Sequence, residues 1–121
     1  MKGLVIAGHG SKSSDFKNVL SLHKKRIEKL GVFEEVEIAF VEEGSPTLAE
    51  VIDSMKSETI FIVPLFVSPG YHVSKNIPEL IEKAETSKRR RIVLCDAVGD
   101  DIFVTFAIIN KIFHLVEELQ K

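Results

Sequence analysis

The sequence has little of several residue types on which whole classes of protein depend. Its 121 residues include no tryptophan, one tyrosine and one cysteine. Tryptophan and tyrosine side chains for stacking on bases are therefore scarce, and a net charge of −2 provides no basic field of the kind that nucleic-acid binders use. We expect no nucleic-acid partner.

A single cysteine excludes an internal disulfide. Cys95 lies within the apolar run 92–97, where we interpret it as a small buried residue in a reducing compartment. Long apolar runs are also missing, because the N-terminal stretch 3–7 is too short for a signal-peptide core or a membrane span. We therefore predict a cytoplasmic protein with no membrane partner.

No stretch rich in proline, glycine or serine divides the chain, so we expect a single domain over residues 1–121. A chain of this length buries enough surface to fold without a disulfide or a structural metal.

Four short apolar runs are rich in valine and isoleucine and lack strict alternation, which is typical of strands buried on both faces. They cover residues 4–7, 36–41, 59–66 and 92–97. Segments with helical spacing lie between them and after the last. The alternation predicts an α/β fold with a four-stranded parallel sheet flanked by helices, which binds its ligands beyond the carboxyl ends of the strands.

Capping signals place the helix boundaries. Gly31 ends the first helix, and the second is expected to begin at Ser45-Pro46, where serine caps and proline takes the first helical position. The third is expected to begin at Asn76, with Glu79 three residues later in a capping arrangement.

The final helix, over about 101–119, is more apolar than one core-facing stripe requires. We expect one face to pack on the sheet and a second face to contact a partner subunit, which predicts a homodimer. The first face comprises Ile102, Phe106, Ile109, Phe113 and Val116, and the second Val104, Ile108, Ile112, Leu115 and Leu119. The alternative is a helix held more deeply in the monomer.

Two histidines follow predicted central strands. His9 lies between Gly8 and Gly10, whose small size leaves the imidazole presented at the sheet edge, and His72 lies in the loop after the third strand. Imidazole binds middle-row divalent metals and accepts protons near neutral pH, so we predict that this pair carries the chemistry. A glycine-rich turn also binds phosphate through backbone amides, in which case His9 would be incidental.

Carboxylates reach the same edge at Glu42 and Glu43, where one of them could serve as a third ligand or a proton acceptor. In a regular strand only one of two neighbours points toward the cleft. The alternative is that both complement the dipole of the following helix. His23, on an apolar helical stripe, and His114, late in the last helix, are not assigned to the site.

These residues resemble the small archaeal-type CbiX sirohydrochlorin chelatases over essentially the whole chain. The resemblance rests on Gly8-His9-Gly10-Ser11, on Ala39-Phe40-Val41-Glu42 followed by Pro46, on Pro64-Leu65-Phe66 leading to Gly70-Tyr71-His72-Val73 and Ile77-Pro78, and on Val98-Gly99-Asp100-Asp101.

This resemblance implies insertion of Co²⁺, or of Ni²⁺, into sirohydrochlorin without ATP, in cobalamin or coenzyme F430 synthesis. It implies that His9 and His72 bind the incoming metal, which is a substrate, and that no cofactor is permanently bound. Of the two carboxylates, Glu42 is the better match to the family and is assigned to catalysis with the two histidines. The resemblance also implies half of a two-domain chelatase, assembled as a homodimer.

Sirohydrochlorin carries acetate and propionate groups, so its cleft should provide hydrogen-bond donors. The residues expected to bind it are Gly10, Ser11, Lys12, Ser13, Gly70 and Tyr71, with Lys75 as a further donor. The basic cluster 88–91 precedes its strand and should lie at the opposite edge.

The sequence is also compatible with two other functions. A binding module would hold the same molecules without turnover. A histidine-dependent phosphoryl-transfer enzyme is less consistent with the sequence, because Gly8 stands where Arg-His-Gly phosphatases have the arginine that clamps phosphate.

Overall fold

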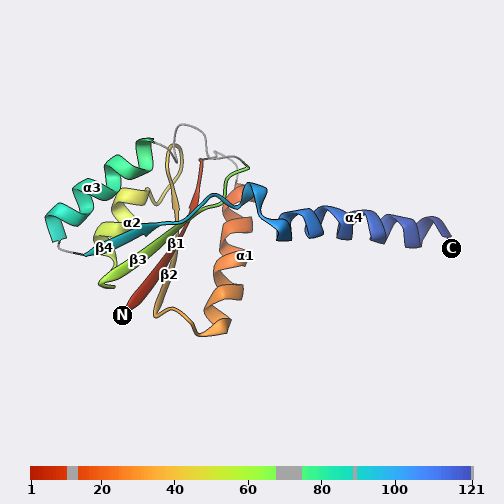
Figure 1. The fold of residues 1–121 in the computed structure, drawn as a ribbon, viewed down its shortest axis with the longest axis horizontal. Helices are drawn as coiled ribbons and strands as arrows, with labels where there is room; N and C mark the ends of the chain where they lie inside the picture. Colours follow the sequence, from red (N-terminus) through yellow and green to blue (C-terminus); the bar gives the residue numbers. More distant parts are fainter. Residues whose placement is uncertain (11–13, 68–74, 89, 121) are drawn as a thin grey trace.

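The computed structural model describes residues 1–10, 14–67, 75–88 and 90–120, and for residues 84–88 it describes the backbone alone. The elements alternate as the sequence predicts (Figure 1). In chain order they are β1 (Lys2–Gly8), α1 (Ser14–Leu30), β2 (Glu35–Phe40), α2 (Leu48–Ser54), β3 (Thr59–Pro64), α3 (Ile77–Lys88), β4 (Arg91–Leu94), the short 3-10 helix η2 (Val98–Asp100) and α4 (Ile102–Gln120).

The strands form one parallel sheet in the order β2-β1-β3-β4, which confirms the predicted fold class. Strand β1 lies in the centre, paired with β2 on one side and β3 on the other. Its residues Val5 and Ala7 are fully buried, as expected of a strand covered on both faces. The central position of β1 brings the loop that carries His9 between the loops that follow β2 and β3.

The start of the second helix differs from its predicted position. The Ser45–Pro46 bond is cis, and the carbonyl of Pro46 accepts a hydrogen bond from the amide of Phe40. Proline is therefore held in the loop, and Thr47 caps α2 in a capping box with Glu50. A Ser-Pro pair indicates a helix start locally, but this loop hydrogen-bonds back to β2, and the helix begins at Leu48 instead.

The two faces of the sheet are covered unequally. Helices α2 and α3 pack on one face, and their side chains share a core with Ile60, Ile62 and Ile92. The other face carries α1, whose Leu20 is fully buried against β1 and β2. In Figure 1 strand β4 passes in front of α2, so this view looks onto the face that carries α1.

The last helix has its predicted extent, but the prediction that it packs on its own sheet is wrong. Helix α4 projects away from the rest of the chain, and none of its residues is buried (Figure 1). Both of its apolar faces are therefore open, including the one expected to contact the core. The alternative of a helix held deeply in the monomer is also wrong. Among the described helices, none is long and apolar enough to cross a membrane.

Polar groups at the amino edge of the sheet pair with one another. The carboxylate of Glu35 accepts hydrogen bonds from the backbone amides of Lys56 and Ser57 and from the hydroxyl of Ser57. The side chain of Ser57 is buried. Burial by itself raises the pKa of Glu35, but these hydrogen bonds outweigh it and lower the pKa below its ordinary value. The carboxylate thus joins β2 to the segment that enters β3.

The basic cluster also lies at this amino edge, as predicted, in the part that the structure describes. Arg91 begins β4, and the Arg90 guanidinium donates a hydrogen bond to the carbonyl of Ile52 near the end of α2. Arg90 therefore ties the entry of β4 to α2, on the side of the sheet opposite His9.

Candidate functional site

The backbone beyond the ends of β1 and β2 places two candidate residues side by side. After the last paired residues of these strands, the amide of Val41 donates to the carbonyl of Gly8 at 2.9 Å, and the amide of Glu42 donates to the carbonyl of His9 at 2.8 Å. These bonds extend the strand pairing by about one residue past the sheet. His9 and Glu42 are thereby held as neighbours at the carboxyl edge.

The two side chains meet across this edge. Nε2 of His9 lies 3.3 Å from Oε2 of Glu42, and the side chains are 54% and 48% exposed. A neighbouring carboxylate helps to orient the imidazole ring, while both groups remain accessible to a ligand. The structure thus places the carboxylate of Glu42 beside the histidine.

Gly10 allows the loop after β1 to approach the loop after β2. Its φ of +145° lies where side chains are strained, and a Cβ at this position would come within 2.5 Å of the Glu43 amide nitrogen. The absence of a side chain at Gly10 therefore permits the spacing of His9 and Glu42. This is a steric role, separate from the predicted contact of Gly10 with substrate.

Phe66 is a site residue that the sequence analysis quoted only as part of a motif. Its ring meets the imidazole of His9 edge to face, with centroids 5.7 Å apart and planes 80° apart. Phe66 also belongs to the buried core on the side of α2 and α3. Phe66 therefore connects the imidazole of His9 to the buried core. Its position two residues after the end of β3 is the feature of the sequence that could have identified it as a site residue.

Lys17 was missed altogether. Its side chain reaches from α1 to the loop after β2, where the ammonium donates to the carbonyl of Ser45 at 3.1 Å. Lys17 is exposed and adds a positive charge to the rim of the site. Its helical position, one turn into α1, carried no motif that would have distinguished it from a solvated surface lysine.

Several predicted site residues lie outside the described residues. These are Ser11, Lys12, Ser13, Gly70, Tyr71 and His72. The meeting of His9 with His72 therefore stays a prediction. Lys75 is described and exposed, just before α3.

The other two histidines lie apart from the site. His23 is half-buried within α1, and His114 is exposed on α4. Within the described ranges, no group of three histidine, cysteine, aspartate or glutamate side chains is placed to hold a metal ion. The described part of the site therefore consists of the His9–Glu42 pair, backed by Phe66 and bordered by Lys17.

Comparison with known proteins gives consistent relatives. A Saccharolobus solfataricus sirohydrochlorin cobaltochelatase is 27% identical over 122 residues, which cover 93% of this chain and 94% of that protein. A Methanococcus maripaludis sirohydrochlorin cobaltochelatase is 29% identical over 84 residues, which cover 67% of this chain and 58% of that protein. The match to a Halobacterium salinarum relative spans only 26% of that protein's length.

The fold is also found in solved structures. The sirohydrochlorin chelatase SirB of Bacillus subtilis subspecies spizizenii, determined in complex with cobalt, superposes with a TM-score of 0.81 at 22% identity, over 93% of this chain and 50% of SirB. At that identity the likeness establishes the fold alone. The model of the CbiX family matches residues 3–115. The chain, with its His9–Glu42 pair at the carboxyl edge of a parallel sheet, belongs to the CbiX family.

Proposed function

We propose that this chain is a metal chelatase of the lyase class, which inserts Co²⁺ into sirohydrochlorin without ATP. Family membership and the activity named for its relatives support the substrate pair. The observation that carries the proposal is the accessible His9–Glu42 contact at the carboxyl edge, where parallel sheets bind their ligands.

Metal insertion requires three operations, and His9 and Glu42 have the chemical groups for them. The ion must lose water, be held beside the macrocycle, and replace two pyrrole protons. The imidazole of His9 replaces a water ligand without the tight hold of a thiolate, so that transfer to the ring nitrogens remains favourable. The carboxylate of Glu42, 3.3 Å from the imidazole, accepts one pyrrole proton at a time and, being half exposed, passes each to solvent.

His72 is proposed as the second metal ligand. It follows β3, which pairs directly with β1, and the amide of Leu65 donates to the carbonyl of Ala7 at 2.8 Å. The loops bearing His9 and His72 therefore start from adjacent strands. Two imidazoles supplied from neighbouring loops would hold the ion between them while leaving coordination positions for the macrocycle.

The acetate and propionate groups of the substrate require donors around this pair. We propose that Gly10, Ser11, Lys12, Ser13, Gly70 and Tyr71 bind them, as the sequence predicts. The structure adds Lys17, whose ammonium already lies at the rim of the site. A cationic donor recognises a carboxylate through a charge-assisted hydrogen bond.

The finer features of the proposal come from the sequence and the resemblance. They are a single domain over residues 1–121, a homodimer, a cytoplasmic location and no permanently bound cofactor. Cobalt is favoured over nickel, because the relatives are named cobaltochelatases. The two ions accept the same ligands, so Ni²⁺ is a second substrate to assay.

The test is a spectroscopic assay of cobalt insertion. Sirohydrochlorin is mixed with Co²⁺ and the protein, and the change in the absorption spectrum is followed against the spontaneous reaction. We expect a rate proportional to protein concentration, greatly reduced in His9→Ala and in His72→Ala. His114→Ala is the matched control, because it removes an exposed imidazole from a helix remote from His9.

Two outcomes would contradict the proposal. Binding of sirohydrochlorin without a rate above the spontaneous reaction would indicate a binding module. An unchanged rate in the double variant His9→Ala/His72→Ala would show that the histidines do not carry the reaction. Release of phosphate from model esters, with no spectral change, would indicate phosphoryl transfer instead.

A further inference from the structure

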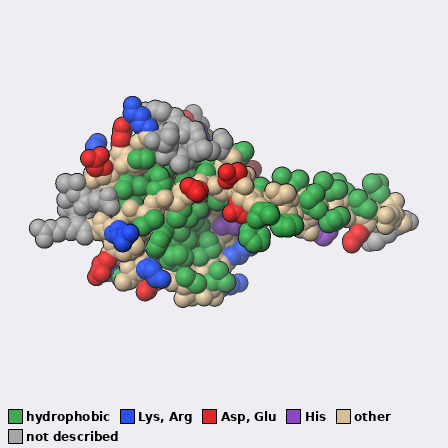
Figure 2. Space-filling model, in the orientation of Figure 1, with side chains coloured by type: hydrophobic (Ala, Val, Ile, Leu, Met, Phe, Trp, Pro, Cys, Tyr) green, Lys and Arg blue, Asp and Glu red, His purple; other side chains and the backbone are tan. Residues whose placement is uncertain are grey.

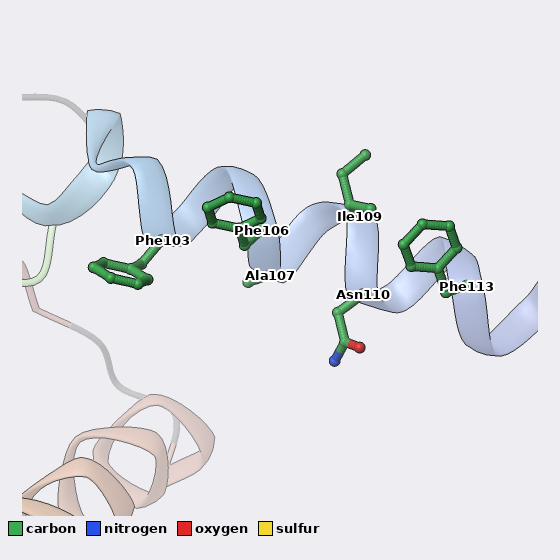
Figure 3. Close-up of a pocket in the computed structure, with 6 residues that line it drawn as sticks. All are labelled: Phe103, Phe106, Ala107, Ile109, Asn110 and Phe113. Carbon is green, nitrogen blue, oxygen red and sulfur yellow. The ribbon is translucent and has the colours of Figure 1, made fainter.

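Phe66 differs in its surroundings from the aromatic residues on the surface. Hydrophobic side chains lie across the middle of the domain and again along α4 (Figure 2). On α4, the rings of Phe103, Phe106 and Phe113 are more than half exposed (Figure 3). Phe66 is only 9% exposed, yet its ring meets the imidazole of His9, which is about half exposed. A buried residue thus reaches a side chain of the site.

The backbone around His9 is held from both neighbouring strands. On the side of β2, the carbonyl of His9 accepts a hydrogen bond from the amide of Glu42 at 2.8 Å. On the side of β3, the amide of Leu65 donates at 2.8 Å to the carbonyl of Ala7, two residues before the histidine. The direction of the imidazole therefore depends mainly on the side-chain torsions of His9.

Glu42 restricts these torsions only weakly. Its side chain is 48% exposed, and Oε2 lies 3.3 Å from Nε2 of His9. An exposed contact of this kind adds little net stability, because ordering two solvated side chains costs conformational entropy. In the proposed reaction the same carboxylate also accepts protons. A group that takes no part in the chemistry would hold the imidazole more constantly.

Phe66 has the properties of such a support. Its ring packs in the core that β3 shares with α2 and α3. Its backbone is held on both sides, since Leu65 hydrogen-bonds to β1 and Val67 lies so close to Gly99 that no Cβ would fit there. The edge-to-face contact, with planes 80° apart, restricts the tilt of the imidazole as well as its position. Nε2 of the same imidazole still faces Glu42.

We propose that Phe66 is a positioning residue, which holds the imidazole of His9 in its metal-binding orientation before the ion arrives. The inference rests on the proposed function, in which His9 is a ligand of Co²⁺. A ligand that is already oriented loses less conformational freedom on binding, so the affinity for the ion is higher. The hydrocarbon ring of Phe66 acts through His9 and does not bind the ion itself. Its removal should weaken metal binding and leave recognition of the tetrapyrrole unchanged.

The test is the affinity of the whole chain for Co²⁺ alone, measured by equilibrium dialysis without sirohydrochlorin. Phe66→Leu keeps an apolar side chain in the core and removes the ring. We expect its Kd for Co²⁺ to rise about tenfold, which is typical of losing a group that orients a metal ligand. Phe66→Tyr keeps the ring and should bind Co²⁺ as the natural chain does.

Phe33→Leu is the matched control. Phe33 and Phe61 also meet edge to face, with centroids 6.0 Å apart, but Phe33 lies just before β2, at the amino edge of the sheet. This variant removes a ring of the same kind far from His9. We expect a lower free energy of unfolding in urea and an unchanged Kd for Co²⁺.

The kinetics of cobalt insertion give a second readout. In Phe66→Leu the KM for Co²⁺ should rise about tenfold, in line with the weaker binding of the ion. The KM for sirohydrochlorin should be unchanged, because the substituted ring is buried beneath the imidazole rather than presented to the macrocycle. A general loss of structure would raise both KM values or lower kcat alone.

Four outcomes would overturn the proposal. An unchanged Kd in Phe66→Leu would show that His9 is oriented without the ring. Equal weakening in Phe66→Leu and Phe33→Leu would assign the effect to stability. Equal weakening in Phe66→Leu and Phe66→Tyr would show that the ring contact is not the cause. A natural chain that binds no Co²⁺ would overturn the inference together with the proposed function. A natural chain that binds Co²⁺ but inserts none would contradict the proposed function alone, and the comparison of Kd values would still decide the role of Phe66.

Discussion

Polar side chains at the two edges of the sheet differ in hydrogen bonding and in exposure. At the amino edge, the Glu35 carboxylate accepts hydrogen bonds from three donor groups of Lys56 and Ser57, which joins β2 to the segment that enters β3. At the carboxyl edge, His9 and Glu42 contact each other but remain about half exposed. The comparison indicates that the amino edge contributes stability and that the carboxyl edge is left accessible for a ligand.

The largest effect should come from removing the imidazole at the carboxyl edge. His9→Ala should lower the rate of cobalt insertion by more than about a hundredfold, because loss of a metal ligand exceeds the loss typical of its supporting groups. The free energy of unfolding, measured in urea, should change little because His9 is about half exposed. A large loss of stability would show that the carboxyl edge also stabilises the fold, and would contradict the distinction drawn between the two edges.

A substitution at the amino edge should have the opposite effect, lowering stability and leaving activity intact. Glu35→Ala should reduce the free energy of unfolding by about 2–3 kcal/mol, because the buried hydroxyl of Ser57 loses its acceptor. Cobalt insertion below the unfolding transition should be retained. Glu58→Ala is a control, since it removes a nearby acidic side chain that is not among the acceptors of these hydrogen bonds.

Glycine substitutions compare strain at the site with strain elsewhere. Gly10→Ala should lower cobalt insertion by about tenfold and stability by about 1–2 kcal/mol, because the added methyl group pushes against the backbone of Glu43. Gly31→Ala introduces strain at a positive φ of +68° with nothing within 4 Å of the new methyl group. It should cost stability alone, and an equal loss of activity in both variants would argue against a positioning role for Gly10.

The smallest expected effect is on how the free energy of unfolding changes with pH in the acid range. Because hydrogen bonding lowers the pKa of Glu35 in the folded chain, its contribution to stability is present above the ordinary value of 4.5. That contribution is lost as the pH falls below this value and through the lowered pKa. Urea unfolding at a series of pH values should show a weaker acid dependence in Glu35→Gln. An identical dependence in the natural chain and the variant would assign the acid sensitivity to other groups.

Sequence patterns predicted the elements better than their contacts. Runs of valine and isoleucine located all four strands, and Gly31 marked the end of α1, because these signals act over a few residues. The start of α2 was misplaced because the hydrogen bond between Phe40 and Pro46 joins segments that local capping preferences do not describe. The projecting α4 was missed for a similar reason, since an apolar face indicates burial without indicating against which chain.

The candidate site was predicted in part. The resemblance favoured Glu42 over Glu43, and the structure places the Glu42 carboxylate beside the imidazole of His9. Phe66 and Lys17 were not foreseen as site residues, because their roles depend on distances across the sheet edge rather than on a motif. Sequence reasoning thus found the groups expected to react, and the structure added the groups that hold and border them.

Gly99 lies where the base of α4 meets the segment that follows β3. It precedes α4, and a Cβ added to it would come within 1.7 Å of the carbonyl oxygen of Val67, which follows β3. Even a methyl group at this position would force the two segments apart. A hydrogen in place of a side chain at Gly99 therefore lets the start of the last helix pack directly on the chain as it leaves the sheet.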